Sequence, residues 1–154
     1  LTGHAMQADG AVGMQVLKIA EAKCSLGFWQ AVALGTFCNA LVCLAVWLCY
    51  GAQSNTDKIL AVLFPITAFV AAGFEHSVAN MYFVPMGLFL KFTANSQLWA
   101  ALGAEASDFS ALTTEQFLLG NLLPVTLGNI LGGSVMVGLV YWFVYLRNDE
   151  HSAS

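Results

Sequence analysis

The chain has 154 residues, of which 58% are hydrophobic and 9% are charged, and its formal net charge is −4. Soluble domains carry charge on about a quarter of their residues, so this composition indicates an integral membrane protein with about three spans. No basic patch alternates with aromatic residues, which argues against a nucleic-acid partner. The chain begins at Leu1 without a signal peptide, and we expect it to be a fragment of a longer chain.

The first spanning helix is predicted over residues 30–50. Residues 1–29 are mixed in polarity and predict an extramembrane loop with a short amphipathic helix over Val12 to Glu21. Residues 30–50 contain no charge, and a helix of this length is about 31 Å long, enough to cross the hydrocarbon core. Residues 51–58 form a polar connector with four candidate N-caps for the next helix, namely Ser54, Asn55, Thr56 and Asp57.

Residues 59–90 are apolar but too long for one span, since a continuous helix would be about 48 Å long. Glu75 and His76 lie side by side within this run, followed by Ser77 and Asn80. A break at about 75–80 resolves the excess length and leaves two half-helices, 59–74 and about 81–90. Irregular backbone persists at membrane depth only where protein or water surrounds it, and broken helices commonly form substrate sites.

The last span is predicted over residues 117–147, after a polar loop at 91–116 with a short helix around Ser96 to Leu102. Asn121 is a candidate cap for this span, and Pro124 suits its first turn. Gly128 and Gly132 form a G-x-x-x-G pair, which lets another backbone come close. Aromatic residues followed by a cation mark its interface end: Tyr141, Trp142, Tyr145 and Arg147. Residues 148–154 form a polar tail, and we expect a single domain.

The two ionisable residues of the break are the first candidates for chemistry. His76 titrates near pH 6.5 when unperturbed, so it could donate a hydrogen bond to an anion, attract the anion when protonated, or pass a proton to it. Its structural alternative is a hydrogen bond to a backbone carbonyl at the break. Glu75 would repel an anion, and capping of freed amides or bonding to a neighbouring helix is favoured for it. No H-E-x-x-H or H-x-x-E-H pattern is present, so a zinc peptidase has no support.

Other polar and aromatic residues in the spans have two open interpretations. Asn39 and Asn129 could line a pore or hold the broken segment by interhelical hydrogen bonds. Phe69 and Phe83 flank the break and could be hydrophobic gates, although spacing alone favours packing. Lys23 could gather anions at a vestibule or be simply solvated. The cysteines match no metal pattern and are interpreted as packing residues, and no cofactor or metal is expected: Cys24, Cys38, Cys43 and Cys49.

Three stretches of the chain resemble the formate–nitrite transporter family, and within it the formate channels of bacteria. They are Gly73-Phe74-Glu75-His76-Ser77-Val78-Ala79-Asn80-Met81 with Pro85-Met86-Gly87, Asn121 to Gly133 with Tyr141-Trp142, and Asn39 to Trp47. The likeness runs from about Ala20 to Arg147, and its motifs are long and specific.

The resemblance implies an all-α, aquaporin-like bundle of six helices in two inverted repeats, assembled as a homopentamer with one pore per protomer in a bacterial inner membrane. This multi-pass chain would supply helices four to six, three spans with the middle one broken, and its partner would be the N-terminal half of the same protein. Residues 51–58 and 148–154 would be cytoplasmic, and residues 1–29 and 91–116 periplasmic. Counting positive charges nominally gives the opposite orientation by three to two, and we follow the resemblance.

The resemblance also assigns roles by position. His76 matches the central pore histidine, Asn39 and Asn129 match pore-lining asparagines, Phe69 matches an aromatic residue at the periplasmic constriction, and Lys23 matches a basic residue near the periplasmic entrance. Glu75, Ser77 and Asn80 would support the helix break. The first three helices are absent, with their broken helix, its threonine and the cytoplasmic constriction, as is the segment implicated in pH gating. The chain alone is therefore not expected to enclose a pore.

The main functional hypothesis is a passive channel for formate and related small monovalent anions, with His76 between hydrophobic constrictions. The alternatives are a proton-coupled formate or nitrite transporter and a non-transporting membrane subunit in which Glu75 and His76 only hold a kink. An enzyme is the least supported class, because no nucleophile–base pair is present. The residues do not distinguish formate from nitrite or hydrosulfide.

Overall fold

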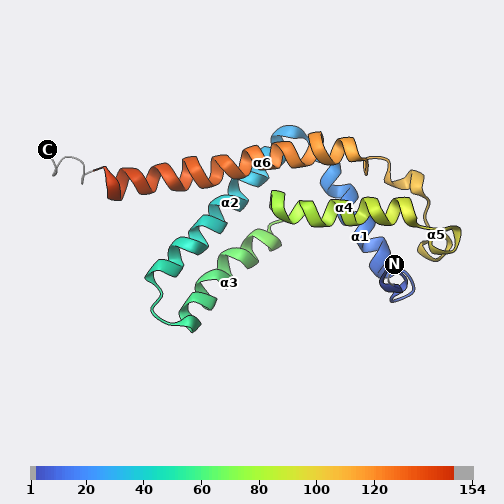
Figure 1. The fold of residues 1–154 in the computed structure, drawn as a ribbon, viewed down its shortest axis with the longest axis horizontal. Coiled ribbons are helices and arrows are strands. Elements are labelled where there is room, and N and C mark those ends of the chain that lie inside the picture. The colour runs from blue at the N-terminus through green and yellow to red at the C-terminus, as the bar shows by residue number, and fades with distance from the viewer. Residues whose placement is uncertain (1–2, 148–154) are drawn as a thin grey trace. The chain divides into compact units, whose positions relative to one another are not determined.

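The computed structural model describes residues 3–147, which form helices joined by short connections (Figure 1). This agrees with the predicted all-α class. The elements, in chain order, are η1 (Gly3–Met6), α1 (Ala11–Cys24), α2 (Phe28–Gly51), α3 (Asn55–Ala71), α4 (Ser77–Thr93), α5 (Ser96–Leu102), η2 (Ala106–Phe109), η3 (Gln116–Leu122), α6 (Leu123–Ile130), η4 (Leu131–Leu139) and η5 (Trp142–Leu146). The last four follow one another as a single helix of 31 residues, Gln116–Leu146, with π-helical stretches at η3, η4 and η5.

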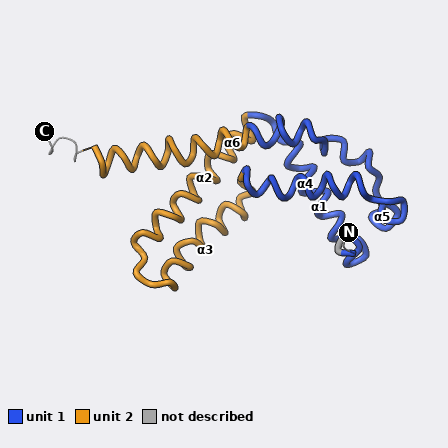
Figure 2. The backbone as a smooth tube through the Cα atoms, in the orientation of Figure 1, with its two compact units in different colours: residues 1–28, 77–123 blue, residues 29–76, 124–154 orange. Residues whose placement is uncertain are grey.

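Where the sequence predicts a single domain, the chain packs as two compact units (Figure 2). Unit 1 contains residues 1–28 and 77–123, and unit 2 contains residues 29–76 and 124–154. The division passes through the interruption between α3 and α4 and through the long C-terminal helix. Each unit therefore joins segments that are far apart in the sequence.

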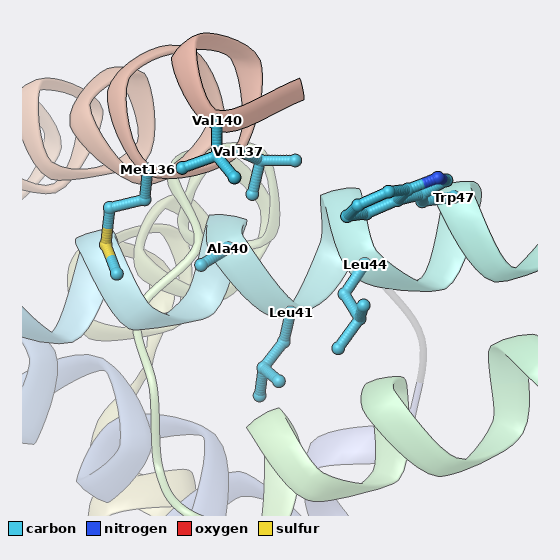
Figure 3. Close-up of a pocket in the computed structure, with 7 residues that line it drawn as sticks. All are labelled: Ala40, Leu41, Leu44, Trp47, Met136, Val137 and Val140. Atoms are coloured by element: carbon cyan, nitrogen blue, oxygen red, sulfur yellow. The ribbon is translucent and has the colours of Figure 1, made fainter. Parts of the chain in front are cut away.

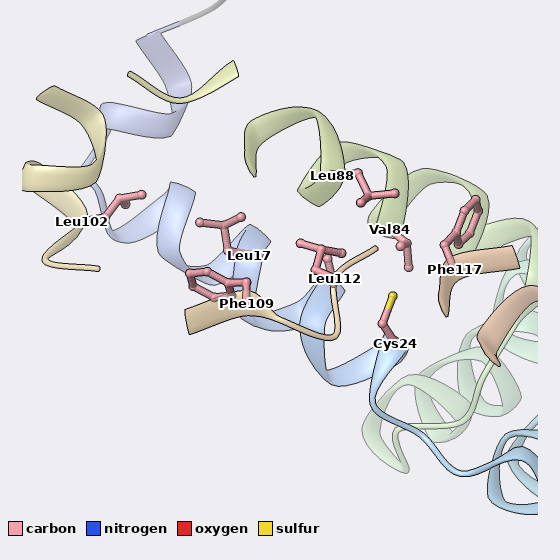
Figure 4. Close-up of a cluster of buried hydrophobic side chains, with 9 residues drawn as sticks. Leu17, Cys24, Val84, Leu88, Leu102, Phe109, Leu112 and Phe117 are labelled. Atoms are coloured by element: carbon pink, nitrogen blue, oxygen red, sulfur yellow. The ribbon is translucent and has the colours of Figure 1, made fainter. Parts of the chain in front are cut away.

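Unit 1 is built on the packing of α1 against α4. The buried residues of α1 recur at spacings of four, three and four residues, which is one face of a helix, and they are Gly13, Leu17, Ala20 and Cys24. This confirms the amphipathic helix expected near the N-terminus. A side chain at Gly87 of α4 would collide with the Cβ atom of Ala20, so the two helices pack at close range. Val84 and Leu88 of α4 complete the apolar contact (Figure 4).

The 91–116 connection completes the core of unit 1, although its sequence predicts a polar loop with one short helix. The expected short helix is confirmed as α5, whose N-cap Asn95 accepts a hydrogen bond from the amide of Leu98 at 2.9 Å. Phe109 and Leu112 are buried in the cluster that α1 and α4 share. The ammonium of Lys91 donates to the carbonyl oxygens of these same two residues, at 2.7 and 3.0 Å. A partly buried cation thus ties the connection to α4.

Unit 2 brings α2 against the middle of the long C-terminal helix. A Cβ atom at Gly128 would collide with the carbonyl oxygen of Val32, and one at Gly132 would collide with that of Thr36. At Gly35 of α2 a Cβ atom would lie 2.7 Å from the carbonyl oxygen of Val125. The G-x-x-x-G prediction is therefore confirmed, because these glycines allow direct backbone approach.

Farther along unit 2, α2 and the long helix line a shallow apolar pocket, and Figure 3 shows the side chains that form it. They are Ala40, Leu41, Leu44, Trp47, Met136, Val137 and Val140. The ring of Trp47 lies edge-on to Tyr141 and Tyr145, with centroid distances of 5.8 and 6.1 Å. Two residues of the predicted aromatic belt, Tyr141 and Tyr145, thus contact Trp47, and the interface position of the belt stays a prediction.

The start of α3 follows the expected capping chemistry. The hydroxyl oxygen of Ser54 accepts from the amide of Asp57 at 3.1 Å, and the carboxylate of Asp57 accepts from the amide of Ser54 at 3.1 Å. This reciprocal pair is a capping box. Of the four candidate N-caps, Ser54 is the one used.

The interruption of the middle segment lies at residues 72–76, earlier than the expected 75–80. Gly73 has a φ of 67°, a left-handed conformation that glycine adopts without a Cβ clash, and this ends the helical path just after Ala71. Helix α4 then begins at Ser77, four residues before the expected start of the second half-helix. Ser77 and Asn80 consequently lie in the first turn of α4 and not in the irregular segment.

Two further expectations for the last helix need correction. Asn121 and Pro124 were expected at its beginning, but both lie inside the continuous helix Gln116–Leu146. The helix itself begins at Gln116, one residue before the predicted start of the span, so only the roles given to Asn121 and Pro124 change. Asn121 lies five residues inside this helix and therefore is not its N-terminal cap.

Among the described residues, two helices are long and apolar enough to cross a membrane, α2 and Gln116–Leu146. Only 17% of the apolar window of α2 is buried inside the structure, so most of that helix needs lipid or protein around it. Helices α3 and α4 have 17 residues each, about 26 Å, slightly less than the hydrocarbon core. A third, broken span made from both stays a prediction.

Candidate functional site

His76 is the last residue of the interruption and belongs to unit 2. Its side chain is partly exposed, and its ring centroid lies 6.4 Å from that of Phe69, with an angle of 36° between the rings. Phe69 lies in the last turn of α3. The imidazole and the aromatic residue expected at the constriction are therefore neighbours in one compact unit.

Two asparagines hold the backbone beside His76. The Nδ2 atom of Asn129 donates to the carbonyl oxygen of Glu75 at 3.1 Å and to that of Gly35 at 2.9 Å. The Nδ2 atom of Asn39 donates to the carbonyl oxygen of Asn129 at 2.6 Å. We call these contacts the asparagine network. It joins α2, the interruption and the long helix, so the holding interpretation of both asparagines rests on observed hydrogen bonds, while pore lining stays a prediction.

An aromatic contact with α2 also holds the interruption. The ring of Phe74 stacks on that of Phe37 of α2, with a centroid distance of 5.8 Å and an angle of 28°. Glu75, between Phe74 and His76, is 5% exposed. The residue before His76 is therefore buried, whereas the imidazole of His76 itself is partly exposed. Among the residues that the structure describes, no group of three or more His, Cys, Asp or Glu could hold a metal ion.

The remaining predicted residues lie in unit 1. The Nδ2 atom of Asn80 donates to the Oδ1 atom of Asn121 at 2.7 Å, and the Nδ2 atom of Asn121 donates to the carbonyl oxygen of Lys23 at 2.9 Å. The ammonium of Lys23 lies 5.7 Å from the ring centroid of Phe83. Ser77 is buried at the start of α4. Sequence reasoning missed Asn121 as a site residue, although it opens one of the stretches that carry the family resemblance.

The asparagine network leads to a graded prediction. Replacing Asn129 with leucine removes at least the two donated hydrogen bonds described above, and replacing Asn39 with leucine removes the one that it donates to Asn129. At about 1 kcal/mol for each bond, we expect about 2 kcal/mol of destabilisation in the first variant and about 1 kcal/mol in the second. Thermal unfolding of the complete protein in detergent measures the difference. Equal melting temperatures for the two variants would contradict the network.

Comparison with known proteins supplies the wider context. Residues 1–143 match the family model described as Formate/nitrite transporter. The formate channel FocA of Escherichia coli K12 is 46% identical over 151 residues, covering 98% of this chain and 53% of that protein. A probable formate transporter of Methanothermobacter thermautotrophicus is 46% identical over 120 residues, covering 78% of this chain and 35% of that protein.

Solved structures agree with these sequence matches. A pentameric formate channel with formate bound superposes with a TM-score of 0.87 at 45% identity, covering 93% of this chain and 56% of that one. An ion channel of the same family superposes with a TM-score of 0.65 at 37% identity, covering 84% and 45% of the two chains. The chain spans about half the length of the first of these curated relatives and about a third of the second.

Proposed function

This chain belongs to the formate/nitrite transporter family, and from that premise we propose that the complete protein is a transmembrane channel for formate and related small monovalent anions. The family resemblance of the sequence is confirmed, and the helical fold matches that of a formate channel. The family transports anions and is not a family of enzymes.

The observation that carries the proposal is the way in which the asparagine network fixes the residue before His76. Asn129 bonds the carbonyl oxygen of Glu75, and the ring of Phe74 stacks on α2. An ionisable residue at membrane depth is costly, and it persists where it faces a cavity or an ion path. Hydrogen bonding and ring stacking hold the interruption in place, and the partly exposed imidazole of His76 lies at its end. An ionisable group that is both fixed in position and accessible is what an ion path needs.

In the proposed mechanism an anion crosses two apolar constrictions and meets His76 between them. Phe69, whose ring lies beside the imidazole, forms the periplasmic constriction and excludes hydrated ions because a narrow apolar passage dewets. An anion that sheds water there loses hydrogen bonds, and this is costly unless they are replaced. The N–H group of His76 donates the replacement bond, which favours a small anion with exposed oxygens.

The proposal includes the assembly and location of the complete protein. The N-terminal half supplies the other helices around the path, including the second constriction. Five copies assemble as a homopentamer in a bacterial inner membrane, with residues 1–29 and 91–116 on the periplasmic side. The match to a pentameric formate channel supports this assembly, and the uncovered apolar surface of α2 supports its need for lipid or protein neighbours.

Anion currents through the complete protein in planar bilayers test the proposal. Formate, nitrite and chloride gradients are applied in turn, with the pH varied around 6.5, where imidazole titrates. We expect a formate-selective current that persists without a proton gradient. Formate uptake that requires a proton gradient, without such a current, would support the proton-coupled transporter. The absence of both would leave the non-transporting subunit.

A further inference from the structure

Two fully buried asparagines form a direct amide pair in unit 1. Asn80 of α4 and Asn121 of the long helix both have an exposed fraction of 0%, and the Nδ2 atom of Asn80 lies 2.7 Å from the Oδ1 atom of Asn121. Burial of an amide is unfavourable unless its hydrogen bonds are made. The bond from Asn80 fixes the rotamer of Asn121, because it occupies the carbonyl oxygen and turns the NH₂ group the other way.

The NH₂ group of Asn121 meets the end of α1. Its Nδ2 atom donates to the carbonyl oxygen of Lys23 at 2.9 Å. Helix α1 ends at Cys24, so this oxygen is among the last four carbonyls, which no amide of the same helix can satisfy. Asn121 thus acts as a C-terminal cap for α1 from 98 residues away in the sequence.

The side chain of Lys23 is held from a second direction. Its ammonium lies 5.7 Å from the ring centroid of Phe83, within the range of a cation–π contact. Phe83 follows Asn80 by three residues on α4, so the two side chains lie on the same side of that helix. Helix α4 therefore acts on Lys23 in two ways. Asn80 of α4 orients Asn121, which bonds the backbone of Lys23, and Phe83 of α4 contacts the ammonium of Lys23.

We propose that Asn121 is a positioning residue for Lys23, which it holds at the place where the family resemblance expects the anion entrance. This inference rests on the proposed channel function. A fixed positive charge at an entrance raises the local concentration of anions, and this matters most when the bulk concentration is low. Asn121 itself touches no anion in this proposal and acts only by setting where the Lys23 charge lies.

The first test measures the Lys23 side chain without any transport. The complete protein and its Asn121→Ala variant are treated with an amine-acylating reagent, and modification of each lysine is followed by mass spectrometry. We expect Lys23 to react about fivefold faster in the variant, because the hydrogen bond that is lost contributes about 1 kcal/mol. The exposed Lys58 is the reference for reagent activity. Unchanged reactivity of Lys23 would overturn the proposal.

A second lysine controls for general loosening of unit 1. The ammonium of Lys91, eleven residues after Asn80 on α4, bonds the carbonyl oxygens of Phe109 and Leu112 in the same unit. We expect its reactivity to stay the same in the variant. Equal acceleration at Lys91 and Lys23 would mean that the unit has opened and would overturn a specific positioning role. Asn121→Ser, a smaller polar replacement that cannot span the distance, gives the same comparison if the alanine variant does not fold.

The second test uses conductance. In the complete protein, Asn121→Ala and Lys23→Gln should each lower the single-channel formate conductance about twofold at low formate concentration and leave it unchanged at saturation. The double variant should equal Lys23→Gln, because Asn121 acts through that lysine. Additive losses would overturn the proposal. If the unaltered protein carries no anion current, the channel function fails, and the acylation rates still decide whether Asn121 positions Lys23.

Discussion

Replacing His76 with phenylalanine should reduce the formate current of the complete protein about 10- to 100-fold at low formate concentration. A hydrogen bond to a charged group contributes about 1.5–3 kcal/mol, and each 1.4 kcal/mol is a factor of ten. The substitution also places a second phenyl ring beside Phe69, whose ring is 6.4 Å from the imidazole. An apolar pair at that position favours dewetting of the path. Planar-bilayer recordings with formate on both sides measure the effect.

Two comparisons make this result specific to the imidazole. The variant should elute from size exclusion as the same oligomer as the unaltered protein, because the hydrogen bonds of the asparagine network end at Glu75 and not at His76. His76→Asn keeps a hydrogen-bond donor at the site and should retain part of the current while losing its pH dependence near the titration range of imidazole. A phenylalanine variant with unchanged current and pH dependence would exclude His76 from the conduction path.

Replacing Gly132 with valine should prevent unit 2 from packing. A Cβ atom there collides with the carbonyl oxygen of Thr36 and lies 2.9 Å from its carbonyl carbon and 3.1 Å from the amide nitrogen of Ala40. These are backbone atoms of α2, so a rotamer change cannot relieve the contact, and the two helices have to move apart. Overpacking costs about 1–3 kcal/mol, and a backbone collision lies at or above the upper end of that range. We expect little folded protein.

Gly138 provides the matched control on the same π-helical segment, η4. A Cβ atom at Gly138 meets only the carbonyl oxygen of Gly133 at 3.4 Å, an ordinary van der Waals distance. Gly138→Val introduces the same residue into the same helix and should preserve both yield and melting temperature. Detergent-solubilised protein is quantified by fluorescence size exclusion for the two variants. Similar yields of folded protein would show that α2 and the long helix tolerate separation at Gly132.

Several features follow from local sequence alone, because the physical cause is contained in a few neighbouring residues. Chain length and the absence of charge predict the α2 span, since a helix of fixed rise either is or is not long enough for the bilayer. The short helix α5 and a capped start of α3 within residues 54–57 follow from local side-chain chemistry, and the structure selects Ser54 among the four candidate caps. Gly128 and Gly132 predicted close helix packing, although the partner backbone was not identifiable from their spacing.

The position of the helix interruption did not follow from local sequence. Polar residues at the centre of residues 59–90 predicted a break, but its position at 72–76 depends on the left-handed turn at Gly73 and on the early start of α4. Polarity was a misleading marker because Asn80 meets its polar partner on another helix and does not need an irregular backbone.

The sequence by itself determined the family, the helical class, and the candidate site residues around His76. The tertiary structure decided how they are connected: Asn129 reaches 54 residues back to Glu75, and Asn121 reaches 98 residues back to Lys23. An asparagine within an apolar helix has the same local pattern whether it lines a path, caps a helix or holds a distant backbone. Only the fold supplies its partner, because a buried amide is stabilised by whichever donor or acceptor packing brings within reach.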